Sequence, residues 1–254
     1  MELVRTAALI TGGASGLGAA AARALAAAGC MTVVADVDGR AGAKVAADIG
    51  GRFVRLDVTD EASMTEAVEV AAGMGVPLRV AVACAGIGPG ERTLHPDASP
   101  HSEELFRRVI EVNQVGTFHL LRLAASKIAM TDPLTDGERG VVIMTSSIAA
   151  FDGQGGTLAY SASKGAVTGM TLPAARDLQR FGIRVCTIAP GAFDTPMLAT
   201  ATDSKRAELA GAVVFPRRLG KPDEFGALVR VIAEISYLNG EVIRLDGGLR
   251  MGPS

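Results

Sequence analysis

Cysteine is scarce in this sequence: the 254 residues include only Cys30, Cys84 and Cys186, which are far apart. Each lies in an apolar run that is typical of a buried strand, so we expect three buried thiols and neither a disulfide framework nor a zinc site. The three histidines have no spacing typical of metal ligands. No metal is therefore expected.

An excess of charge of one sign is also lacking. The 25 basic and 27 acidic residues give a net charge of -2 and are interspersed, so no basic face for nucleic acid or an anionic membrane is expected. No apolar run approaches the roughly 20 residues that cross a bilayer. The first apolar run begins near residue 7, which leaves no room for a signal or transit peptide. These absences favour a cytoplasmic protein with a small-molecule partner.

Hydrophobic residues, by contrast, make up 48% of the chain, which is ample for a large core. Short β-branched runs alternate with longer alanine-rich segments, as in repeated strand–helix units around a parallel sheet. Several runs are apolar throughout, as expected of strands covered by helices on both faces. No linker or shift in composition divides the chain. We therefore predict one α/β domain over residues 1–254, with a single Rossmann-type doubly wound parallel sheet of about seven strands and helices on both faces.

The predicted strands are residues 7–11, 31–36, 52–57, 79–86, 140–147, 182–190 and 240–246, and the predicted helices are 16–28, 39–49, 60–73, 102–130, 157–180 and 222–235. Two longer irregular stretches, 87–100 and about 192–220, interrupt this alternation. Both follow the carboxyl ends of predicted strands, where open α/β sheets bind their ligands. We expect both to shape the substrate pocket, and the second to cover the substrate.

A glycine-rich turn, TGGASGLG at residues 11–18, follows the first predicted strand and opens the first predicted helix. Gly12, Gly16 and Gly18 permit a tight turn and the close approach of a pyrophosphate to the positive end of the helix. Such a triplet alone is a weak signal, because other strand-to-helix turns also contain glycines. Its place between a strand and a helix makes it a candidate dinucleotide site.

Asp36 ends the second predicted strand, twenty residues after Gly16. A carboxylate at that place can accept hydrogen bonds from an adenosine ribose and would repel a 2′-phosphate. Ser15 offers no positive charge for such a phosphate, so NAD is favoured over NADP. Arg40, nearby, is the one residue that weakens this preference. The alternative is that Asp36 only caps the helix beginning near residue 39.

The ends of the third and fourth predicted strands supply further candidates. Asp57 and Val58 are placed to flank an adenine ring, although Asp57 could equally cap the helix that begins near residue 60. Cys84, Ala85 and Gly86 are small enough to let the backbone approach a cofactor. We expect Cys84 to pack in the core, because no histidine near it in the sequence would activate a thiolate.

Tyr160 is one of only two tyrosines, and Lys164 follows it by four residues in a predicted helix. The two side chains therefore share one face, and the cation is expected to lower the phenol pKa, which favours a proton acceptor for an alcohol. Ser147, thirteen residues before Tyr160, is placed to hydrogen-bond the substrate oxygen. Its neighbour Ser146 should face the opposite side of the strand. The alternative is an ordinary helix whose tyrosine packs and whose lysine extends along the surface.

Together these motifs resemble the short-chain dehydrogenase/reductase family. The resemblance covers nearly the whole chain and rests on TGGASGLG, Asp36, CAG at 84–86, Asn113 in EVNQVGTF, TSSIAAF, YSASK and APGAFDTP. It implies an NAD-dependent oxidoreductase that interconverts a secondary alcohol and a ketone. In such an enzyme Tyr160 is the acid/base, and Lys164 binds the ribose and lowers the phenol pKa. Ser147 positions the substrate, and Asn113 supports a proton-relay water.

The same resemblance places Gln154 at the substrate and the APGAFDTP turn at the nicotinamide end. The cofactor-binding residues expected from the motifs and the resemblance are Gly12, Ser15, Gly16, Leu17, Gly18, Asp36, Asp57, Val58, Cys84, Ala85, Gly86, Tyr160, Lys164, Pro190, Gly191, Phe193 and Thr195. The expected substrate contacts are Ser147, Gln154 and Tyr160.

FDGQGG, GIRVCTIAPG, FPRRLGKPDEF and LNGEVIRLDGGLRM resemble the members of this family that act on 3-hydroxyacyl-CoA. The favoured reaction is therefore the interconversion of 3-hydroxyacyl-CoA and 3-oxoacyl-CoA. The same chemistry on a hydroxysteroid, another secondary alcohol or a 3-oxoacyl-carrier-protein is an alternative, and a non-catalytic NAD-binding module is another. Arg217, Arg218 and Lys221 could meet a CoA phosphate or form a solvated or salt-bridged turn.

The predicted helices 102–130 and 157–180 are apolar or small over most of their circumference, beyond one core-facing stripe. Burial within a large domain would explain this composition. The family resemblance implies instead that these helices pair across a dimer, within a homotetramer built from dimers. Pro173 lies inside the second helix and should bend it or remove one backbone hydrogen bond.

Overall fold

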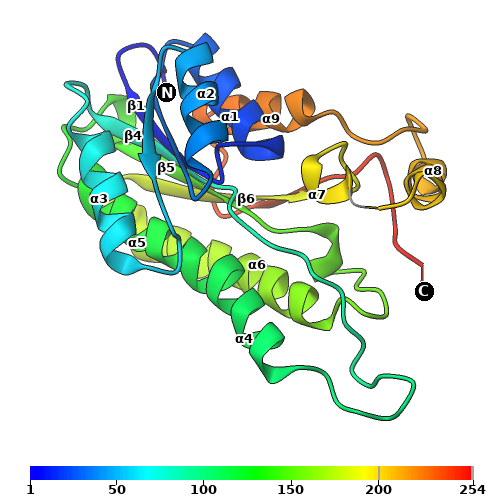
Figure 1. Cartoon of the computed structure of the whole chain (residues 1–254). Coiled ribbons are helices and arrows are strands. Elements are labelled where there is room, and N and C mark those ends of the chain that lie inside the picture. The colour runs from blue at the N-terminus through cyan, green and yellow to red at the C-terminus, as the bar shows by residue number, and fades with distance from the viewer. Residues whose placement is uncertain (200, 253–254) are drawn as a thin grey trace.

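A seven-stranded parallel sheet with helices on both faces forms the centre of the computed structural model, which describes residues 1–199 and 201–252 (Figure 1). The strand order in these residues is β3-β2-β1-β4-β5-β6-β7. The strands are β1 (Ala7–Thr11), β2 (Met31–Asp36), β3 (Arg52–Arg55), β4 (Leu78–Ala83), β5 (Gly140–Thr145), β6 (Ile183–Pro190) and β7 (Val242–Leu245). The chain reverses its direction across the sheet between β1 and β4, the place where such sheets bind ligands. The predicted doubly wound fold is confirmed.

The sheet separates two hydrophobic cores, because successive side chains of a strand point to opposite faces. Leu9 of β1 and Val142 of β5 belong to one core, whereas their neighbours Ile10 and Ile143 belong to the other. The first core is closed by α3 (Glu61–Ala72), α5 (Gly116–Ile128) and α6 (Leu158–Leu178), and the second by α1 (Gly16–Ala27), α2 (Gly39–Asp48) and α9 (Pro222–Glu234). Strands that are apolar along their whole length are therefore buried on both sides.

The segment 102–130, which we predicted as one continuous helix, is interrupted. It consists of α4 (Glu103–Ile110), a π-helical turn at Glu111–Val115 and then α5. The Thr117 hydroxyl donates a 2.7 Å hydrogen bond to the Asn113 carbonyl, and such a side-chain bond competes with the regular backbone ladder. α6, by contrast, continues through Pro173 as one helix.

The prediction of irregular structure holds for one of the two stretches and fails for part of the other. Residues 87–100 contain isolated bridges and no helix, as predicted. The stretch around 192–220 includes two helices that we did not predict, α7 (Pro196–Ala199) and α8 (Asp203–Ala212). The start of α8 is fixed by Thr202, whose side chain accepts a hydrogen bond from the Lys205 N–H.

All three cysteines are free thiols: Cys30 and Cys186 are buried and Cys84 is partly buried. Within the described residues, no three or more His, Cys, Asp or Glu side chains lie together in a way that could hold a metal ion. The same part of the chain contains no helix that is long and apolar enough to span a membrane.

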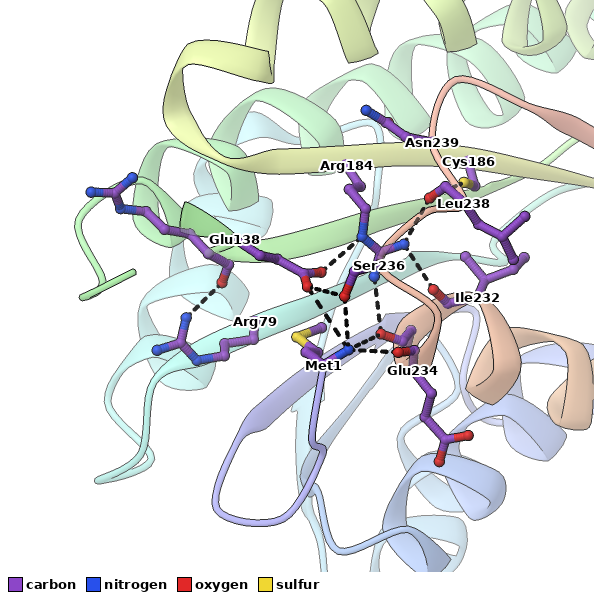
Figure 2. Close-up of polar contacts among 12 residues, drawn as sticks. Met1, Arg79, Glu138, Arg184, Cys186, Ile232, Glu234, Ser236, Leu238 and Asn239 are labelled. Atoms are coloured by element: carbon purple, nitrogen blue, oxygen red, sulfur yellow. Dashed lines mark hydrogen bonds and ion pairs between the residues drawn. The ribbon is translucent and has the colours of Figure 1, made fainter. Parts of the chain in front are cut away.

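A buried polar network lies at the amino ends of β5 and β6 (Figure 2). Arg184 of β6 pairs with Glu138, just before β5, with Nε and Oε1 2.8 Å apart. The Ser236 hydroxyl donates to the other Glu138 oxygen, and the Met1 ammonium donates to the Glu234 carbonyl. Arg184 also donates at 2.8–2.9 Å to the carbonyls of Ile232, Leu238 and Ala233. The network thus holds the end of α9 against the sheet, at the edge opposite the carboxyl ends of the strands.

Candidate active site

A cavity of about 550 Å³ opens where β1, β2, β4, β5 and β6 end. Side chains and backbone from loops far apart in the sequence meet there. The structure brings all the predicted cofactor residues and Ser147 to its walls: Gly12, Ser15, Gly16, Leu17, Gly18, Asp36, Asp57, Val58, Cys84, Ala85, Gly86, Ser147, Tyr160, Lys164, Pro190, Gly191, Phe193 and Thr195. Asn113 and Gln154 do not line it.

The turn after β1 leaves no room for a side chain at Gly12 or Gly18. A Cβ on Gly12 would lie 2.5 Å from the Ala85 nitrogen, and one on Gly18 would lie 2.1 Å from the Gly12 carbonyl oxygen. Gly12 also has a φ of +66°, which glycine adopts readily. The first residues of α1 line the cavity, and Ser15, the N-cap of α1, makes no side-chain cap bond, so no side-chain cap competes with a ligand for the first N–H groups of the helix. This arrangement fits a bound pyrophosphate.

Asp36 is held by the backbone at the end of β2. Its Oδ2 accepts from the Ala14 N–H and its Oδ1 from the Asp38 N–H, each at 3.0 Å. The cap of α2 is Asp38, whose Oδ1 accepts from the N–H groups of Arg40 and Ala41. The alternative that Asp36 caps this helix is therefore wrong. Its carboxylate lines the cavity instead, with lone pairs left for a ribose.

Asp57, which follows β3, also lines the cavity. Its Oδ1 accepts from the N–H and hydroxyl of Thr59 at 2.9 and 2.7 Å. These two bonds, with the charge of Arg108, hold the pKa of Asp57 below its usual range. α3 is capped by Asp60, which accepts from the Ala62 N–H, so Asp57 is not the cap of that helix.

Tyr160 and Lys164 of α6 line the cavity together with Ser147, which follows β5. The Ser147 side chain interacts with Tyr160 and favours its charged form, and the Lys164 Nζ lies 5.8 Å from the centre of the Tyr160 ring. The Lys164 ammonium donates to the Thr145 carbonyl at 2.8 Å. Ser146 also lines the cavity, and its hydroxyl donates to the Lys164 carbonyl of α6; the prediction that it faces the opposite side of the strand is not confirmed. The three predicted catalytic side chains thus form one cluster on the β5–α6 side of the cavity.

The electrostatics of this cluster differ from the prediction. Burial raises the pKa of Tyr160, and the interaction with Ser147 offsets only part of this effect. Burial also lowers the pKa of Lys164 to about 8. We expected Lys164 to lower the pKa of the Tyr160 phenol. In the protein without a cofactor the phenol pKa is raised instead, because removal from water disfavours the charged form of both side chains.

Lys164→Met should change how stability depends on pH. Because the folded-state pKa of about 8 lies below the ordinary lysine value of about 10.4, the wild type carries a penalty for the buried charge. The penalty is complete below pH 8 and disappears as pH rises towards the ordinary value. Relative to wild type, the variant should therefore lose on the order of 3 kcal/mol between pH 7 and pH 10. Urea unfolding at both pH values measures this difference.

The unpaired Thr145 carbonyl in that variant contributes equally at every pH, so it does not alter the predicted trend. Lys205→Met removes an exposed lysine from α8 and serves as the control, with no comparable pH dependence. A constant difference between Lys164→Met and wild type would contradict the prediction.

Asn113 lies in the π-helical turn and is fully buried. Its Oδ1 accepts from the Ile87 N–H at 2.8 Å, and its Nδ2 donates to the Ile87 carbonyl and to the Ser163 hydroxyl at 2.9 and 3.0 Å. The side-chain amide is therefore fully used in fixing the start of the loop after β4. A role in a proton-relay water stays a prediction.

Gln154 lies between β5 and α6, and its Nε2 donates to the Gly252 carbonyl at 2.9 Å. Contact with the substrate stays a prediction for this residue. In the basic turn, Arg218 forms a two-pronged ion pair with Glu224, at 2.7 and 2.9 Å. That arginine is salt-bridged, as the simpler alternative predicted.

Some cavity residues were not predicted from the sequence. Arg108 of α4 lines it, and its charge acts on Asp57; nothing in the sequence distinguishes this arginine from its neighbour Arg107. Other unpredicted residues come from the loop after β4 and from α7: Ile87, Gly88, Pro196, Met197 and Leu198. Their stretches were expected to shape the pocket, but the individual side chains depend on how the stretches fold.

Comparison with known proteins adds an independent result. The family model described as short chain dehydrogenase matches residues 6–206. The 3-hydroxyacyl-CoA dehydrogenase type-2 of Drosophila melanogaster is 49% identical over 248 residues, covering 96% of this chain and 97% of that protein. The Homo sapiens protein of that name is 47% identical over 249 residues, covering 97% and 95%. A crystal structure of 3-hydroxyacyl-CoA dehydrogenase type-2 from Mycobacterium avium matches with a TM-score of 0.95 at 41% identity, covering 98% of both chains.

Proposed function

The chain belongs to the short-chain dehydrogenase family, and on that premise we propose that it is an NAD-dependent enzyme that interconverts 3-hydroxyacyl-CoA and 3-oxoacyl-CoA. The observation that carries the proposal is that Ser147, Tyr160 and Lys164 share one cavity with Asp36 and the glycine turn. A protein that only binds NAD has no need of those three side chains together. One domain, residues 1–254, supplies both the cofactor site and the catalytic groups.

In the direction of alcohol oxidation, the Tyr160 oxygen takes the proton of the substrate hydroxyl while Ser147 holds the substrate oxygen. In the proposed complex Lys164 binds the cofactor ribose, and its charge favours the phenolate against the opposing effect of burial on the Tyr160 pKa. When bound, oxidised NAD would accept the hydride from the carbon that carries the hydroxyl, and its positive charge would further favour the phenolate. In the reverse direction Tyr160 returns its proton to the ketone oxygen.

Asp36→Ala should weaken the preference for NAD. The carboxylate that we propose binds the ribose hydroxyls is lost, and so is the repulsion of a 2′-phosphate. Loss of hydrogen bonds to a charged group predicts about a 10- to 100-fold fall in kcat/KM with NAD. The fall with NADP should be smaller, so the ratio between the two cofactors shifts towards NADP. Steady-state kinetics with both cofactors measure this ratio.

Asp38→Ala is the matched control for that substitution. It removes the cap of α2, two residues away, and should lower the stability by about 1 kcal/mol without changing the cofactor ratio. An unchanged ratio in Asp36→Ala, or an equal change in both variants, would refute the proposed role of Asp36.

An acyl-CoA substrate is supported by the relatives named for that reaction and by the apolar side chains of Ile87, Met197 and Leu198 at the cavity wall. The test follows NADH consumption with acetoacetyl-CoA, a steroid ketone and a simple β-keto ester, and repeats the fastest with NADPH. We expect acetoacetyl-CoA and NADH to give the fastest reaction. Turnover of the steroid alone would refute the acyl-CoA assignment, and no turnover with any ketone would favour a non-catalytic module.

We also propose the homotetramer built from dimers that the family resemblance implies. Phe118 of α5 and Leu158 and Leu172 of α6 are each 45–48% exposed. These large apolar side chains lie on the two helices expected to pair across a dimer, and pairing would remove them from water.

A further inference from the structure

The loop that follows β4 forms one wall of the catalytic cavity. Ile87 and Gly88 line the cavity, and a Cβ on Gly88 would lie 3.5 Å from the Tyr160 ring and 3.6 Å from the Met197 Sδ. The backbone of the loop thus packs directly beside the catalytic tyrosine. Its position determines how much space a substrate has on that side of Tyr160.

Two separate sets of contacts hold this loop. The first is the Asn113 side-chain amide, which forms hydrogen bonds with the N–H and carbonyl groups of Ile87. The second is centred on Glu91, whose backbone N–H donates to the Gly156 carbonyl at 2.8 Å and whose backbone pairs with Thr157 in a parallel bridge. Thr157 is the N-cap of α6. Glu91 therefore ties the loop to the start of the helix that carries Tyr160.

The Glu91 carboxylate makes a second connection, to α4. Its Oε1 accepts from the Ser102 N–H at 3.0 Å, and Ser102 is the N-cap of α4. The same oxygen lies 2.8 Å from His95 Nε2, and Oε2 lies 3.8 Å from His101 Nδ1. The Glu91 side chain is only 14% exposed. The Ser102 N–H and the two histidines hold its pKa below the usual range, so it is charged at neutral pH.

From these contacts we infer that Glu91 is a positioning residue: its backbone joins the loop wall to α6, its carboxylate joins the loop to α4, and the second connection holds the first in the place that sets the fit of the substrate beside Tyr160. This inference builds on the proposed function, since it concerns the substrate side of the same cavity. Glu91 is absent from the cavity wall and touches no reacting atom. Its removal should therefore act on substrate binding more than on the chemical step.

The loop supplies a matched control in Asp97, its other carboxylate. Asp97 accepts from the N–H and hydroxyl of Ser99 within the tip of the loop, at 3.0 and 2.6 Å. It therefore has short hydrogen bonds, as Glu91 does, but these join it to its own turn and not to α4 or α6. A general effect of losing a loop carboxylate would appear in both variants.

The test compares Glu91→Ala, Glu91→Gln and Asp97→Ala, using the ketone that the wild type reduces fastest. Glu91→Ala should raise KM for that ketone about 5- to 20-fold with kcat within about twofold of wild type. The affinity for NADH, measured by its fluorescence, should be unchanged. Glu91→Gln should restore part of the loss, because its amide oxygen still accepts from the Ser102 N–H. Asp97→Ala should resemble wild type.

Hydrogen exchange supplies a readout that does not depend on turnover, so failure of the proposed function leaves the inference testable. Glu91→Ala should speed exchange in residues 87–101 and 154–160 and leave the glycine turn unchanged. Wild-type kinetics and exchange in Glu91→Ala would overturn the inference. An equal loss of ketone and NADH binding in Glu91→Ala would show general unfolding and would also overturn the inference. An effect of equal size in Asp97→Ala would overturn it as well.

Discussion

Tyr160→Phe should reduce kcat about 10³-fold or more and leave NADH binding within about twofold of wild type. The substitution removes one hydroxyl group and keeps the ring that packs beside Gly88. In the proposed mechanism, that hydroxyl is the group that exchanges a proton with the substrate oxygen. The loss should therefore appear in the chemical step. NADH absorbance measures turnover, and NADH fluorescence measures binding.

The other tyrosine of the chain provides the control. Tyr237 is fully exposed, and Tyr237→Phe makes the same chemical change outside the cavity. It should leave turnover unchanged. Turnover above about a tenth of wild type in Tyr160→Phe would contradict the role of Tyr160 as acid/base.

The fold was predictable from the sequence because its main signals are local. Strands such as 140–147 are apolar on both faces, and that pattern already requires helices above and below the sheet. The glycine turn and Asp36 could also be placed, since each directly follows a strand whose end is visible in the sequence. Asp36 and Asp57 could not be distinguished from helix caps until Asp38 and Asp60 were seen to cap α2 and α3.

Features that depend on contacts between distant segments were not predictable. The π-helical turn around Asn113 differs from an α-helix by one extra residue, and no periodicity reveals it. The convergence of His95 and His101 on Glu91 depends on how an irregular loop folds. The raised pKa of Tyr160 follows from burial in the cavity, which the spacing to Lys164 does not report. In each case the sequence shows which residues are neighbours along the chain, but it does not show which side chains surround them in the folded protein.

Arg184→Met should be the most destabilising of the substitutions considered, at about 3–5 kcal/mol in urea unfolding at pH 7. It removes the guanidinium partner of the buried Glu138 carboxylate, whose other cation, the Met1 ammonium, lies 3.8 Å away, and it removes one donor from each of three carbonyl groups. Loss of the closer cation from a buried carboxylate explains the size of the effect. The active site lies at the opposite edge of the sheet, so the folded fraction should retain its turnover number. Arg230→Met, which breaks the exposed pair with Glu234, should lower stability by less than about 1 kcal/mol.

Acidification separates this explanation from a simple loss of packing. The pKa of Glu138 is below its usual range in the wild type: burial raises it, but hydrogen bonds from Ser236 and Arg184 outweigh that effect. The wild type therefore keeps this contribution to stability above the ordinary carboxyl pKa and loses it as pH falls through the lower folded-state value. Without Arg184, Glu138 takes up a proton at higher pH, which relieves the buried charge. The difference between Arg184→Met and wild type should thus shrink between pH 7 and pH 4, whereas a packing defect would give the same difference at both.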